Sequence, residues 1–77
     1  MTIPIEDHKW HDLAEYGLKT KLPPGHRIEY TRADGNIVVR IVGPNAHVWG
    51  SSPAGKYALD IAIDYALEWF SKVGGEL

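Results

Sequence analysis

The stretch SPAGKYALDIAIDYALEWFSK, residues 52–72, decides the fold that this chain can adopt. Its apolar residues recur at three- and four-residue spacing, which is typical of one buried stripe on an amphipathic helix. The predicted stripe consists of Ala58, Ile61, Ala62, Tyr65, Trp69 and Val73. Ser52 is a suitable N-cap and Pro53 a suitable first residue, so the sequence predicts a helix that begins at Ser52 and ends at Lys72.

Four more apolar residues of this stretch fall outside the predicted stripe: Leu59, Ile63, Leu67 and Phe70. The apolar sector is therefore wide, and the helix needs cover on two sides. One cover is a sheet. The surplus sector offers a surface for a homodimer, because a second copy could bury it.

A β-hairpin is the clearest local signal. Residues 27–32 and 36–42 are rich in β-forming residues, and Asp34-Gly35 between them favours a two-residue type I′ turn. In this register Ile28 faces Ile41, Tyr30 faces Val39 and Glu29 faces Arg40, so one face is apolar and the other holds an ion pair.

Residues 43–46 form a second turn, and residues 46–51 a short third strand. If this turn also has a two-residue loop, Val48 lies on the core face, while His47 and Trp49 lie on the open face. The sequence leaves the turn length undecided between two and three residues.

Before the hairpin, apolar residues from Trp10 to Leu18 follow a helical spacing, which predicts a first helix over about residues 7–18. Pro23-Pro24-Gly25 then forces a loop. The predicted class is α+β: one small two-layer domain, residues 1–77, in the order helix, three-stranded antiparallel meander, long C-terminal helix (αβββα). Residues 1–6 form an extended lead-in and residues 73–77 a tail.

The composition limits the classes of function. The chain has 77 residues, no cysteine and a formal net charge of −2. Disulfides and thiolate zinc sites are excluded, and the acidic balance disfavours nucleic acid as the partner. Neither a signal peptide nor a membrane-spanning run is visible, so the expected location is the cytoplasm.

The open face of the predicted sheet is the candidate protein-binding site. It carries Arg27, Glu29, Arg40, His47 and Trp49. An exposed tryptophan beside an arginine has the composition of a binding hot spot, and the two side chains are placed to stack as a cation–π pair.

The predicted start of the last helix is a candidate anion site. Residues 50–56 have the spacing of a phosphate-binding loop, but Tyr57 stands where the metal-binding hydroxyl belongs, and Pro53 removes an amide. An NTPase is therefore not predicted. Backbone amides and the helix dipole would still favour an anion near Ser52, Gly55 and Lys56.

The first predicted helix offers a weaker candidate. His8, His11, Asp12 and Glu15 share its polar side at a spacing that can present imidazole and carboxylate to one metal. No other motif supplies further ligands. The prediction is a solvated polar face, with no catalytic residue, no metal and no cofactor.

The helix–meander–helix order resembles the double-stranded-RNA-binding domain, which packs two helices on one face of a three-stranded sheet. The resemblance spans most of the chain as topology. That family carries a basic cluster at the entry of its last helix, where this sequence has the single Lys56. A nucleic-acid function would use the chain's basic residues Lys19, Lys21, Arg27, Arg32, Arg40 and Lys56.

The sequence favours a small non-enzymatic protein-interaction module whose partner is another protein. Inhibitors of the kind that phages and mobile elements encode, and small regulatory subunits, occlude a partner surface with domains of this size. Two alternatives stay open. One is nucleic-acid binding, and the other is a small metal- or anion-dependent enzyme.

Overall fold

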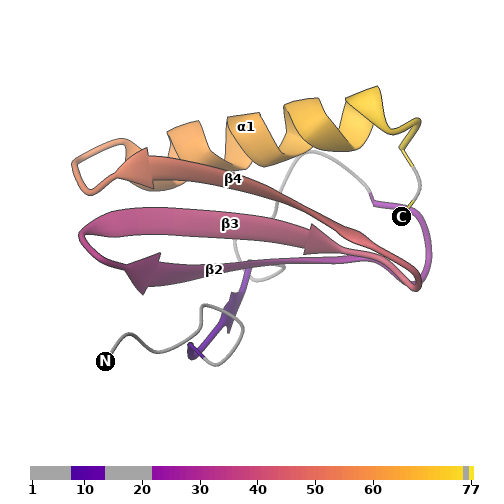
Figure 1. The fold of residues 1–77 in the computed structure, drawn as a ribbon, viewed down its shortest axis with the longest axis horizontal. Coiled ribbons are helices and arrows are strands. Elements are labelled where there is room, and N and C mark those ends of the chain that lie inside the picture. Colours follow the sequence, from indigo (N-terminus) through magenta and orange to yellow (C-terminus); the bar gives the residue numbers. More distant parts are fainter. Residues whose placement is uncertain (1–7, 14–21, 76) are drawn as a thin grey trace.

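The computed structural model describes residues 8–13, 22–75 and 77. Its strands form one antiparallel sheet, and a helix packs across one face of that sheet (Figure 1). The elements are β1 (His11–Asp12), β2 (Arg27–Ala33), β3 (Asn36–Val42), β4 (His47–Pro53) and α1 (Ala58–Lys72). The strand order is β1-β2-β3-β4. The predicted α+β class is confirmed, with four strands and one helix in the described residues where three strands and two helices were expected.

The predicted hairpin is confirmed. Asp34 and Gly35 have φ angles of 51° and 76°, the left-handed pair that a type I′ turn requires. The predicted partners face one another across β2 and β3: Ile28 and Ile41, Glu29 and Arg40, Tyr30 and Val39. Because this register alternates, the isoleucines and Val39 are buried on one face.

The second turn takes the shorter of the two predicted forms. The Gly43 N–H donates to the Ala46 carbonyl at 2.9 Å across a two-residue loop. Ile41 consequently pairs with Val48, which lies on the core side of β4. Trp49 then faces the opposite side of the sheet, as this form of the turn predicts.

The helix predicted over residues 7–18 is wrong where the structure describes it. His11–Asp12 form strand β1 beside Glu29 and Tyr30 of β2. Leu13 continues this pairing, and its N–H donates to the Ile28 carbonyl at 2.9 Å. The remainder of the predicted helix, residues 14–18, lies outside the described residues.

Strand and helix periodicity place Trp10 and Leu13 differently. A helix would set the two side chains, three residues apart, on one face, whereas a strand sets them on opposite faces. Leu13 is fully buried against the core, and Trp10 lies over Arg40 on the other side of the sheet. The extended conformation thus places Leu13 in the core cluster and Trp10 against Arg40 and Trp49 on the opposite face.

The helix α1 begins at Ala58, so the predicted start at Ser52 is wrong; the predicted end at Lys72 is confirmed. Ser52 and Pro53 belong to β4, where Ser52 pairs with Ile37. Tyr57 is the N-cap residue and makes no side-chain capping bond. Pairing with β3 thus competes successfully with the capping signal.

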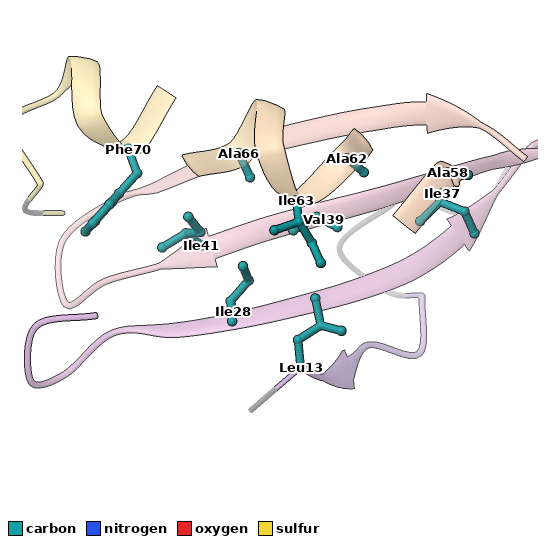
Figure 2. Close-up of a cluster of buried hydrophobic side chains, with 10 residues drawn as sticks. All are labelled: Leu13, Ile28, Ile37, Val39, Ile41, Ala58, Ala62, Ile63, Ala66 and Phe70. Atoms are coloured by element: carbon teal, nitrogen blue, oxygen red, sulfur yellow. The ribbon is translucent and has the colours of Figure 1, made fainter. Parts of the chain in front are cut away.

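The buried face of α1 also differs from the predicted stripe. Ala58 and Ala62 are buried as predicted, but the other buried side chains of α1 are Ile63, Ala66 and Phe70. Figure 2 shows these side chains pointing from α1 toward Val39, Ile41 and Ile28 of the sheet, with Leu13, the residue after β1, reaching the same cluster.

Gly50 explains this choice of face. A Cβ at this position would collide with the backbone O of Ala62 and the backbone N of Ala66. The helix backbone therefore rests directly on β4, and only alanines fit at this contact. Tyr65, whose Cβ lies close to Gly50, and Trp69 project beside β4 and stay half exposed.

At the other end of the sheet, Leu77 lies against two loops. Its N–H donates to Nε2 of His26 at 2.9 Å, and its carbonyl accepts the Asn45 N–H at 3.2 Å. The His26 ring stacks edge-on against Phe70 with centroids 5.6 Å apart. These contacts connect the end of α1 to the sheet. Within the described residues, no helix has the length and apolar composition needed to cross a membrane.

Candidate protein-interaction groove

The predicted binding face is partly covered by the chain itself. Arg40 and Glu29 form an ion pair at 2.9 Å, with side chains only 17% and 14% exposed. The Arg40 guanidinium lies 3.9 Å from the centre of the Trp10 ring and 6.0 Å from that of Trp49. The predicted stacking partner Trp49 is therefore the more distant one, and Trp10 occupies the place over the arginine.

The rest of that face is a ring cluster and one exposed charge. Trp49 packs edge-on against both Trp10 and His47, at centroid distances of 5.4 and 5.0 Å. Arg27 is 59% exposed and lies 3.3 Å from Glu29. The structure thus brings all five predicted residues to one face, but it leaves only Arg27, His47 and part of Trp49 accessible.

The candidate anion residues do not gather at a helix terminus. Ser52 is buried in β4, and its Oγ donates to the Pro53 carbonyl at 3.2 Å. Gly55 and Lys56 lie in the exposed connection before α1. Since the helix begins at Ala58, the three residues do not share the cradle that the sequence suggested.

The candidate metal face is also rearranged. His11 and Asp12 are neighbours in β1 and point to opposite sides of the sheet, while Glu15 lies outside the described residues. Among residues 8–13, 22–75 and 77, no group of three or more potential metal-binding side chains converges.

The basic residues of the nucleic-acid alternative lie apart where they are described. Arg27 and Arg32 occupy opposite ends and opposite faces of β2, and Arg40 lies beneath Trp10. Lys19 and Lys21 fall outside the described residues. The described arginines therefore form no continuous basic surface for a phosphate backbone.

The apolar residues that α1 leaves exposed are not the four that were predicted to form a homodimer surface. Ile63 and Phe70 are buried, and Leu59 and Leu67 pack against the core, so these four already contact the chain's own sheet. The exposed apolar residues instead form a row at four-residue spacing, here called the α1 row: Tyr57, Ile61, Tyr65, Trp69 and Val73. Each is between 43% and 61% exposed.

The α1 row borders the outer edge of β4. Gly43 bonds to Ala46, and hydrogen-bonded pairs alternate along an antiparallel ladder, so Val48, Gly50 and Ser52 bond toward β3. The backbone groups of His47, Trp49 and Ser51 point outward, where no described strand pairs with them. Pro53 is also outward, a place where a missing N–H disturbs no ladder.

Two shallow pockets connect the row to this edge. One, of about 220 Å³, is lined by Trp49, Gly50, Ser51, Tyr65 and Trp69. The other, of about 270 Å³, is lined by Val48, Trp49 and Trp69. Both lie between α1 and β4, and the depression they form is here called the α1–β4 groove.

Acidic side chains flank the helical wall of the groove. Asp64 follows Ile61 by three residues, and Glu68 follows Tyr65 by three, so each lies beside the α1 row. Glu68 is paired with Lys72 at 3.4 Å. Lys72 also lies over Trp69, with its Nζ 4.8 Å from the ring centre. Asp60 and Asp64 form no ion pair within the described residues, so the unbalanced negative charge lies near Ile61.

A signal for the groove was present in the sequence. Apolar residues recur every four residues from Tyr57 to Val73, which indicates one face of a helix. This spacing is the same whether the face is buried or exposed, so the sequence alone does not show which. The deciding residue is Gly50, whose contact with α1 can be known only from the structure.

Comparison of this chain with protein-family profiles, with curated proteins and with solved structures finds no match.

Proposed function

We propose that this chain is a small protein-interaction module that binds a partner protein through the α1–β4 groove. The observation that carries the proposal is the contiguous α1 row beside an edge of β4 with which no described strand pairs. Trp69 and Tyr65, at 53% and 50% exposure, are the residue types that dominate binding energy at protein interfaces.

The architecture supports this assignment. Trp69 and Tyr65 stand on a helix fixed by its contact with Gly50, so little conformational entropy is lost when the row is covered. Rows of half-exposed aromatics are unusual on an isolated small domain and mark contact surfaces. A module of this size acts by covering a partner's surface, as an inhibitor or a regulatory subunit does.

Site-specific photo-crosslinking tests the proposal. A photoreactive phenylalanine analogue replaces Trp69 in one variant and Ser71, exposed on the opposite side of α1, in the control. In an extract of the source cells, we expect a discrete cross-linked product from position 69 alone. An excess of the unmodified protein should remove it, and an excess of Trp69→Ser should not. Identical products from both positions, or none from position 69, would contradict the proposed function.

A further inference from the structure

We infer that the α1–β4 groove binds an extended peptide segment of its partner, which adds to β4 as a further strand. This inference rests on the proposed function and names the chemistry of the partner. The bound segment carries apolar side chains at alternate positions and basic side chains next to the helix.

The backbone of β4 supplies the first part of the argument. His47, Trp49 and Ser51 each direct an N–H and a carbonyl outward, and no described strand uses them. An added strand forms its backbone hydrogen bonds with the N–H and C=O groups of alternate residues on such an edge. Pro53 closes this pattern at one end, because it offers a carbonyl and no N–H.

The α1 row supplies the second part. An added strand beside β4 turns every second side chain toward the helix, where Ile61, Tyr65 and Trp69 stand. From Ile61 to Trp69 the helix rises roughly 12 Å, which an extended chain covers with about four residues. The segment is therefore short, with about two side chains against the row.

The acidic side chains beside the α1 row favour segments that carry basic residues. Asp60 and Asp64 are exposed and have no ion pair within the described residues, whereas Glu68 is paired with Lys72, whose Nζ also lies 4.8 Å from the centre of the Trp69 ring. The unbalanced acidic charge is therefore that of Asp60 and Asp64. Lysine or arginine in the partner, placed on the helix side, would be attracted to these carboxylates, while acidic segments would be repelled.

A second copy of β4 is a less suitable occupant of this edge. Antiparallel pairing of β4 with its copy about a two-fold axis would place both α1 helices side by side on the same face of the joined sheet. Each helix would bring its exposed acidic residues Asp60 and Asp64 to that face, where like charges repel. A basic peptide avoids this repulsion.

The experiment is selection from a displayed library of random peptides on the immobilised full-length protein. Selected peptides are synthesised and titrated calorimetrically against the unaltered protein and against two variants. Trp69→Ser removes the largest side chain of the α1 row, and Ser51→Pro removes one outward N–H at an edge position where proline is tolerated. Circular dichroism establishes that each variant remains folded.

We expect the selected peptides to alternate apolar residues and to contain lysine or arginine. Methylating the backbone nitrogens on their bonding edge should weaken binding about tenfold or more, and each variant should do the same. Exchanging the basic residues for glutamate should weaken binding in low salt.

Three results would overturn the inference: no enriched peptide, enriched peptides that bind both variants unchanged, or binding that is insensitive to backbone methylation. None of them would affect the cross-link from position 69. A cross-link without strand addition would mean that the row meets a folded surface. Loss of the cross-link as well would remove the proposed function itself.

Discussion

Gly50 is the residue on which the placement of α1 depends. Its missing side chain lets the helix backbone touch the strand, and this contact decides which side of the helix is buried. A methyl group there would force the helix outward against the packing of Ala62 and Ala66. The two alanines serve the contact only because glycine faces them.

Replacing Gly50 by alanine should therefore lower the free energy of unfolding by roughly 1–3 kcal/mol, the usual cost of overpacking a core. The control is Gly55→Ala, because a Cβ at Gly55 would approach no atom closer than 4.0 Å. Urea denaturation of both variants measures the difference, and we expect Gly55→Ala to stay within about 0.5 kcal/mol of the parent. Equal losses in the two variants would show that α1 does not rest on Gly50.

Arg40 and Arg27 share the carboxylate of Glu29 but differ in burial, at 17% and 59% side-chain exposure. Arg40→Ala should lower the free energy of unfolding by roughly 1–3 kcal/mol, because it leaves Glu29 poorly paired and removes the support of Trp10. Arg27→Ala should change it by less than about 0.5 kcal/mol. Chemical denaturation in low salt compares them, and a larger effect of Arg27 would contradict this assignment.

At the scale of elements, the β2–β3 hairpin depends on two left-handed residues. No atom lies within 4 Å of a Cβ built on Gly35, so a substitution there tests the backbone alone. Gly35→Ala should cost roughly 1–2 kcal/mol, and Asp34→Asn should be nearly neutral because asparagine tolerates this conformation. Thermal unfolding measures both. A neutral Gly35→Ala would mean that the turn is not of type I′.

The hairpin could be predicted from sequence because its information is local. Asp34-Gly35 fixes the turn, and the alternation of Ile37, Val39 and Ile41 fixes the face. Strand β1 could not be predicted in this way. Residues 10–13 fit a helical spacing as well as an extended one, and their pairing with β2 is a contact between distant parts of the chain.

The start of α1 could not be predicted correctly for a related reason. Ser52 and Pro53 are suitable residues for the start of a helix. In the structure they pair with β3 instead, and this pairing determines their conformation. Of the predicted binding face, the residue positions and the ion pair between Glu29 and Arg40 could be derived from the hairpin register. The cover provided by Trp10 could not, because it follows from β1.

At the scale of the whole molecule, the acidic residues Asp60 and Asp64 on α1 oppose self-association through β4. We expect sedimentation equilibrium to show a monomer from micromolar to submillimolar concentration in low salt, because two copies paired at β4 would bring these like charges to one face. A dimer that persists in Ser51→Pro and dissociates in Trp69→Ser would show that the row itself joins two copies. A dimer lost in Ser51→Pro would show that β4 pairs with its own copy.

The tryptophans give this fold separate optical reporters. Trp10 and Trp49 lie 5.4 Å apart at an angle of 64°, close enough for their indole transitions to couple and contribute to circular dichroism. Trp69 lies half exposed on α1, with Lys72 Nζ 4.8 Å from its ring centre, and its emission wavelength responds to what covers the α1–β4 groove. Detachment of residues 8–13 should change the coupled signal of Trp10 and Trp49 without a matching change in the emission of Trp69. Local opening and global unfolding would then have different spectra.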